Sequence, residues 1–168
     1  MTAAGVLLAL VTLGRLGELW LARRNTQLLF ARGAYELAAG HYPVIVALHS
    51  LWLGSLWVFG IGQPVNAFWL AVFLCLQIGR IWVLSTLGAR WTTRIIVVPG
   101  ERLVARGPYR YVNHPNYIVV IGEIAVLPLC FDLFWLAVLF TVLNAAVLTI
   151  RIRAENAGLK IARHHAAN

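Results

Sequence analysis

The residues best suited to chemistry lie in the stretch 107–117, which reads Gly-Pro-Tyr-Arg-Tyr-Val-Asn-His-Pro-Asn-Tyr. Its two prolines restrict the backbone and keep the residues before them, Gly107 and His114, out of the helical region. An apolar helix is predicted to begin at Pro115, where a proline loses no hydrogen bond. Because a helix N-terminus presents unpaired N–H groups and a partial positive charge, this corner could hold an anion, a carboxylate or a polar cofactor.

Two polar stripes are predicted to converge on this corner. Asn116 and Glu123 lie seven residues apart, on one face of the predicted helix. Asn144, Arg151 and Glu155 follow at steps of seven and four in the next apolar segment. An ionised carboxylate inside an apolar helix is costly unless it is paired or faces a polar cavity. Two interpretations stay open: a pocket at the cytoplasmic interface, which is favoured, and a structural ion-pair network such as Glu123 with Arg151.

The composition indicates a protein built for lipid. The chain has 168 residues, of which 61% are hydrophobic and 12% charged, and its mean hydropathy is +0.78. Soluble domains are about half apolar and a quarter charged. The length predicts a single domain, residues 1–168. Cys75 and Cys130 lie far apart inside apolar runs and are expected to be packing residues, and the histidines are too scattered to propose a metal site.

The elements that must position the polar stripes are apolar runs close to the length of a membrane span. They cover residues 3–22, 42–59, 67–87, 115–131 and 133–150. The sequence therefore predicts an all-α integral membrane protein with five transmembrane helices, the last two forming a hairpin that turns at Asp132. Within the long polar connection before the hairpin, residues 95–98 precede Pro-Gly and are predicted to form a short extended piece.

The distribution of charge predicts the orientation in the membrane. Nearly all Arg and Lys residues lie in the first connection, in the third connection and in the C-terminal tail. By the positive-inside rule the N-terminus is outside, and the C-terminus and the proline-rich corner are cytoplasmic. Membrane orientation thus accounts for the net charge of +8, and no nucleic-acid partner is predicted.

Charged residues also occur inside the apolar runs. Arg15 and Glu18, three residues apart, are expected to form an ion pair turned toward the other helices, and a direct catalytic role is the less favoured alternative. His49 is expected to be a hydrogen-bonded interior residue. Arg80 is predicted one or two turns from the interface, where snorkelling would explain it without any chemistry.

Residues 107–117 resemble the signature G-x-Y-x-x-x-R-H-P-x-Y of the isoprenylcysteine carboxyl methyltransferase and phospholipid methyltransferase superfamily. The tail 151–159 resembles that family's Arg…Glu-Glu-x-x-Leu ending, and residues 15–25 resemble the first-helix pattern of its small bacterial members. The chain departs from the pattern at Asn113, where the family has arginine, and at Asn156, which replaces the second tail glutamate.

The resemblance implies a methyltransferase that uses S-adenosylmethionine and releases S-adenosylhomocysteine. The cofactor would lie in a pocket formed by the last two helices, the loop and the C-terminal tail, and a lipophilic acceptor would enter from the bilayer. Glu155 would bind the amino group or the ribose of the cofactor. Carried over by position, the cofactor-binding residues would be Tyr109, Arg110, His114, Pro115, Asn116, Tyr117 and Glu155.

The catalytic residues are expected to be Glu123, Arg90 and Arg151. Glu123 would serve as a base or as a carboxylate that orients the acceptor, and Arg90 or Arg151 would steady the acceptor anion. The eukaryotic prenylcysteine enzymes of the family use an arginine before the loop, and Arg80 and Arg90 are both candidates for its counterpart.

The resemblance also implies a class of substrate. Residues 91–94 (Trp-Thr-Thr-Arg) and Glu123 look like those of small bacterial enzymes that O-methylate alkylpyrones and alkylresorcinols, which favours a phenolic lipid and a bacterial inner membrane. An isoprenylcysteine carboxylate is also permitted. The alternatives are a phospholipid N-methyltransferase, a reductase of the sterol-reductase type and a non-catalytic membrane scaffold. The oligomeric state is not predicted.

Overall fold

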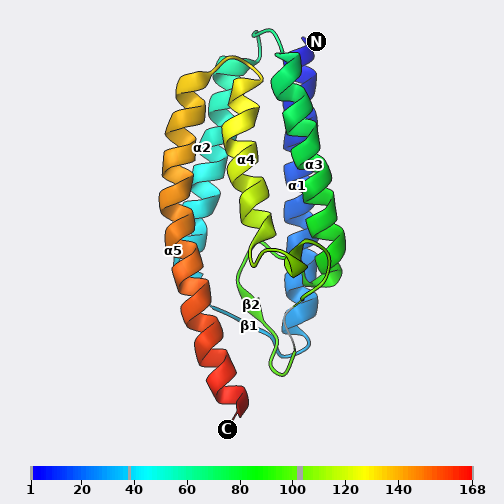
Figure 1. The fold of residues 1–168 in the computed structure, drawn as a ribbon, viewed down its shortest axis with the longest axis vertical. Coiled ribbons are helices and arrows are strands. Elements are labelled where there is room, and N and C mark those ends of the chain that lie inside the picture. The colour runs from blue at the N-terminus through cyan, green and yellow to red at the C-terminus, as the bar shows by residue number, and fades with distance from the viewer. Residues whose placement is uncertain (1, 38, 102–103, 168) are drawn as a thin grey trace.

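Helices aligned along one axis form the body of the protein in this computed structural model (Figure 1). The structure describes residues 2–37, 39–101 and 104–167, and for residues 41 and 156–167 it describes the backbone alone. Arg102 and the side chain of Asn156 lie outside the described part. Within that part the α-helices are α1 (Ala3–Phe30), α2 (Tyr42–Gly60), α3 (Ala67–Leu87), α4 (Pro115–Leu129) and α5 (Phe134–Ala167). The predicted all-α architecture is confirmed.

The helices differ in their ability to cross a membrane. In the described part of the chain, four of them, α1, α2, α3 and α5, are long and apolar enough to do so. Helix α4 has only 15 residues. At about 1.5 Å per residue it covers about 22 Å, which is less than the roughly 30 Å of a hydrocarbon core. Four helices thus have the length of a span, and α4 is a shorter apolar helix among them.

Helices α1 and α5 continue past the apolar runs that predicted them. Helix α1 has 28 residues and α5 has 34. No glycine or proline interrupts the chain from residue 18 to residue 32, and Gly33 follows the helix end with a φ of 80°. The first helix was therefore predicted to end too early, at residue 22, because Arg23 and Arg24 both lie in the last turns of α1.

Helix α4 occupies the middle of the bundle (Figure 1). It packs most extensively against α3 and α5. Gly122 permits the close approach of α3, since a Cβ there would lie 2.8 Å from a methyl carbon of Leu76. The turn into α5 places Asp132 at a φ of 55°, which confirms the predicted tight turn. Cys130 is buried in the core as predicted, whereas Cys75 is exposed on α3 and is not a core residue.

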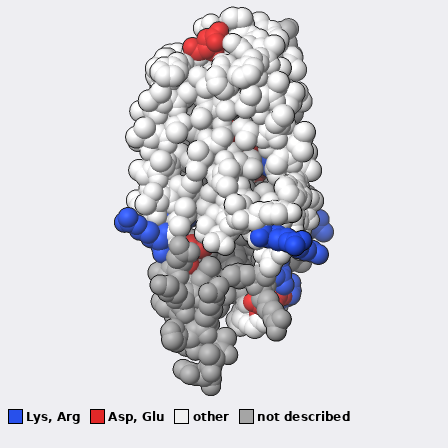
Figure 2. All heavy atoms as spheres, viewed as in Figure 1, with Lys and Arg blue, Asp and Glu red and all other residues white. Residues whose placement is uncertain are grey.

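The two basic connections meet beneath the bundle. Strand β1 (Tyr35–Glu36) pairs antiparallel with β2 (Ile96–Val97), and Leu37 N–H donates to the Ile95 carbonyl at 2.8 Å. The extended piece predicted at 95–98 is confirmed, but its partner strand was missed because two residues carry no periodic signal. Figure 2 shows cationic side chains gathered at one level below a broad uncharged surface. This distribution fits the predicted orientation, which stays a prediction.

A short 3₁₀ helix, Gly107–Arg110, carries the chain from the third connection toward α4. Gly107 has a φ of 57°, and a Cβ at this position would lie 2.5 Å from Oγ1 of Thr86 near the end of α3. Gly100 also has a positive φ, of 74°, but a Cβ there would meet nothing within 4 Å. Glycine at 107 is therefore required both by the backbone conformation and by the contact with α3.

We expect Gly107→Ala to destabilise the protein more than Gly100→Ala. The left-handed backbone alone costs an alanine about 1 kcal/mol, and at Gly107 the clash with Thr86 adds to it, for about 2–3 kcal/mol in total. Thermal unfolding in detergent, followed by circular dichroism, measures both variants against wild type. Equal losses in the two variants would contradict the role assigned to the contact with Thr86.

Candidate active site

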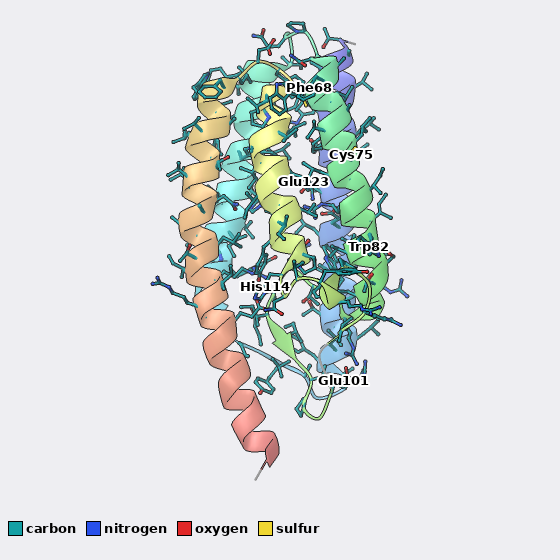
Figure 3. The ribbon with its side chains drawn as sticks, in the orientation of Figure 1. Phe68, Cys75, Trp82, Glu101, His114 and Glu123 are labelled. Atoms are coloured by element: carbon teal, nitrogen blue, oxygen red, sulfur yellow. The ribbon has the colours of Figure 1, made fainter. Side chains whose placement is uncertain are left out.

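The start of α4 and the last described turns of α5 carry one polar cluster, made of His114, Tyr117, Arg151 and Glu155. The Tyr117 hydroxyl donates to Oε2 of Glu155 at 2.5 Å and accepts from Nε of Arg151 at 2.8 Å. The His114 ring stacks on Tyr117 with a centroid distance of 5.1 Å, and its Nδ1 lies 4.0 Å from Oε1 of Glu155. Figure 3 shows His114 at the lower end of α4. We call this set the Tyr117 cluster.

The sequence explains why these side chains meet. Pro115 occupies the first turn of α4 and His114 stays outside the helix with a φ of −131°. Tyr117 then lies in the first turn of α4, and Arg151 and Glu155, four residues apart, share one face of α5. A tight hairpin joins the other ends of the two helices, so this start and this face are neighbours.

The third connection covers the Tyr117 cluster from the side of α2. Nη2 of Arg151 donates to the Thr93 carbonyl at 2.9 Å, and Oγ1 of Thr93 lies 3.0 Å from the Tyr42 hydroxyl. Asn25 is 4% exposed and donates to the Trp91 carbonyl at 2.8 Å. Asn25, Tyr42 and Thr93 were not predicted as site residues. No local signal distinguishes Asn25, because its sequence neighbours Arg24 and Thr26 are polar as well.

The remaining predicted cofactor residues lie around this cluster. Pro115 is buried, Arg110 is exposed, and Oδ1 of Asn116 is buried without a hydrogen-bond partner among the described residues. Burial and, to a smaller extent, the charge of Glu155 raise the pKa of Tyr109 to about 12. The Tyr109 phenol therefore stays protonated at neutral pH and remains able to donate a hydrogen bond.

Arg90 lies away from the Tyr117 cluster. Its Nη2 is 2.5 Å from Oε2 of Glu101, which also pairs with Arg32. Figure 3 shows Glu101 well below His114. The pocket at this place has a volume of about 440 Å³ and is lined by Arg32, Leu87, Ala89, Arg90, Val104, Ala105 and Arg106. This pocket is not the one predicted between the last two helices. Arg90 lines it, and Arg151 does not.

A second polar cluster is buried between α1, α3 and α4, and we call it the Glu123 network. Glu123 is 2% exposed, and its Oε1 accepts from Arg15 at 2.8 Å, from Gln77 at 2.8 Å and from Nε of Arg80 at 2.7 Å. Arg80 also pairs with Oε2 of Glu123 and donates to Glu18 at 3.1 Å. Nη1 of Arg15 donates to Glu18 at 2.8 Å.

The geometry of the Glu123 network tests three predictions about the charged residues. The Arg15–Glu18 pair turned toward the other helices is confirmed. The snorkelling of Arg80 was wrong, because Arg80 is 6% exposed and reaches into the bundle to Glu123. The example pair of Glu123 with Arg151 is also wrong, since Arg151 bonds Tyr117 and Thr93 instead.

The Glu123 network is balanced in charge, with two arginines and two glutamates. His49 Nδ1 bonds the Ile45 carbonyl at 2.8 Å, which confirms the expectation of a hydrogen-bonded interior residue. Both oxygens of Glu123 are engaged by cations. This geometry suits a carboxylate that holds Arg15 and Arg80 in place.

Comparisons with known proteins identify the family of the chain. Residues 69–161 match the model of the isoprenylcysteine carboxyl methyltransferase (ICMT) family, which is more than half of the chain. The chain is also 42% identical to the uncharacterized protein YpbQ of Bacillus subtilis (strain 168) over 160 residues, covering 92% of this chain and 95% of that protein. No solved structure matches the chain at a significant level. The chain therefore belongs to the isoprenylcysteine carboxyl methyltransferase family of integral-membrane methyltransferases.

Proposed function

We propose that this protein is an S-adenosylmethionine-dependent methyltransferase that methylates an oxygen on the polar head of a lipophilic acceptor. The observation that carries the proposal is the Tyr117 cluster, in which a carboxylate, a guanidinium and two stacked rings meet at the start of the short helix α4. A family of methyltransferases and a bundle of apolar helices support the same conclusion.

The residues of the Tyr117 cluster fit S-adenosylmethionine. The Glu155 carboxylate would bind the ammonium group or the ribose hydroxyls of the cofactor. The rings of His114 and Tyr117 offer a stacking face for the adenine. The buried, unpartnered Oδ1 of Asn116 offers a hydrogen-bond acceptor beside them.

The main task of the protein in this reaction is to place the acceptor next to the cofactor. The bound cofactor would supply a methyl group already activated by a sulfonium. The protein must hold the acceptor oxygen in line with that group, which can lower the barrier by several kcal/mol. Arg151, 9% exposed, would favour the anion of a phenol or an enol placed beside it. Neither of these tasks requires Arg90, which lies at the separate pocket.

The acceptor we propose is a phenolic lipid of the alkylpyrone or alkylresorcinol kind. Arg151 of the Tyr117 cluster bonds the Thr93 carbonyl in the basic third connection, so the cluster would lie near the depth of a lipid head group. A long alkyl chain could then remain in the bilayer while the head enters between α4 and α5. We propose that Glu123 orients this site through Arg15 and Arg80, with the base role as the alternative.

We expect S-adenosylhomocysteine to bind the detergent-purified protein and His114→Ala/Glu155→Ala to weaken that binding at least about 100-fold. Two contacts, one of them charged, are lost, and about 1.5 kcal/mol for each corresponds to that factor. Isothermal titration calorimetry measures the affinity. Arg153→Ala, on the exposed side of α5, serves as the matched control. A folded wild type that does not bind would leave the scaffold or a different cofactor as the function.

We expect Glu123→Gln to destabilise the protein by about 3 kcal/mol, because buried Arg80 and Arg15 lose their charge partner. The double variant Arg80→Met/Glu123→Leu should recover most of that loss, since removing both partners leaves no buried charge uncompensated. Thermal unfolding and methyl transfer to extracted lipids are measured together. Loss of transfer in Glu123→Gln at unchanged stability would assign the base role to Glu123.

The same lipid assay tests the alternative function. Methylation of an amine in those lipids would indicate a phospholipid N-methyltransferase.

A further inference from the structure

Several buried polar atoms make no hydrogen bond with any residue that the structure describes. They belong to Trp52 (Nε1), Trp91 (Nε1), Asn116 (Oδ1), Thr141 (Oγ1) and Asn144 (Nδ2). Buried polar side-chain atoms in proteins are nearly always bonded, so each exception calls for an explanation. Asn144 stands out because it is only 3% exposed and its Nδ2 has no hydrogen-bond partner among the described residues.

Three of these residues lie at one level of the bundle. Thr141 and Asn144 are three residues apart and share a face of α5. The ring of Phe59 packs edge-on against Trp135 at 5.3 Å, which sets the register of α2 against α5. The two helices run in opposite directions (Figure 1). Trp52 lies seven residues before Phe59, and residue 142 lies seven residues after Trp135, so Trp52 and residue 142 are at the same level.

This level is also the level of the Glu123 network. The hydrogen bond between Tyr117 and Arg151 sets the register of α4 against α5. Seven residues along α5 separate Arg151 from Asn144, and seven along α4 separate Asn116 from Glu123. Seven residues of helix rise about 10 Å. Asn144 is therefore about 10 Å deeper in the bundle than the Tyr117 cluster and level with Glu123.

We propose that Asn144, with Thr141 and Trp52, forms the subsite that holds the polar head of the methyl acceptor, and that this head is a neutral hydroxyl. The proposal rests on the proposed function and deepens it, because it names the residues that would hold the head of that phenolic or enolic lipid. An amide, a hydroxyl and an indole N–H together provide donors and an acceptor. A hydroxyl both donates and accepts, so one such group pairs with several of these atoms.

The charges at this level disfavour an ionised head. The Glu123 network already balances Arg15 and Arg80 with Glu18 and Glu123, and the three subsite residues are uncharged. A carboxylate or a phosphate would have to give up its water, while the two arginines of this network, Arg15 and Arg80, are already paired with glutamates. A neutral hydroxyl enters at much lower cost and becomes an anion only as it nears Arg151.

A comparison of two buried asparagines tests whether Asn144 binds a ligand or makes a structural hydrogen bond. Asn25 donates to two carbonyls, those of Gly88 and Trp91, whereas Asn144 has no such partner. In the protein without added ligand, we expect Asn25→Leu to lower the Tm and Asn144→Leu to raise it by about 2–4 °C. A fall in the Tm of Asn144→Leu like that of Asn25→Leu would overturn the proposal, because it would show a structural hydrogen bond.

The second measurement is binding of pentadecylresorcinol in detergent, with palmitate as a lipid of similar length and a charged head. We expect wild type to bind the resorcinol, palmitate to bind at least tenfold more weakly, and Asn144→Leu to weaken resorcinol binding at least tenfold. S-adenosylhomocysteine should bind wild type and Asn144→Leu alike. Equal resorcinol affinity in both proteins, no binding to wild type, or a preference for palmitate would each overturn the subsite.

These measurements separate the subsite from the proposed function. Resorcinol binding that depends on Asn144, in a protein that does not bind S-adenosylhomocysteine, would support the subsite and reject the methyltransferase activity. Binding of S-adenosylhomocysteine without resorcinol binding that depends on Asn144 would support the methyltransferase activity and reject the subsite.

Discussion

The Glu123 carboxylate is the constraint on which the rest of the structure depends. It is buried in the middle of an apolar bundle and binds side chains from α1 and α3. Because a buried charge without partners is very costly, these contacts strongly favour one rotation and one depth for the short helix α4. The position of Tyr117 at the start of α4, and hence of the Tyr117 cluster, follows from that restraint.

The bundle separates two polar environments along α4. At its start, the Tyr117 cluster combines a carboxylate, a guanidinium and aromatic rings near the basic connections. About 10 Å deeper, the Glu123 network is closed and balanced in charge. At the level of the Glu123 network, α5 carries Asn144, whose buried Nδ2 has no partner among the described residues. A cofactor with charged groups suits the first environment, and an uncharged head group suits the second.

The resemblance of residues 107–117 to a family signature identified the correct family, and the apolar runs predicted where the helices lie. The expectations that failed concern charged side chains. Arg80 was expected to snorkel because sequence gives depth along a helix but not the direction of a side chain. Arg90 was named because the eukaryotic prenylcysteine enzymes use an arginine before the loop; the structure pairs it with Glu101, and its catalytic role stays a prediction. The roles of the individual site residues stay predictions.

The sequence by itself determined the class of the fold and the family, because hydropathy, helix-starting prolines and a short motif are local properties. It also indicated that Glu123 must be paired or face a polar cavity, since an isolated charge is not tolerated in an apolar helix. Only the tertiary structure decided which arginines pair with Glu123. It also decided that Asn25 Nδ2 is bonded, whereas Asn144 Nδ2 has no partner among the described residues. Those outcomes depend on how residues from different helices meet at one depth, and no local pattern in the chain encodes that meeting.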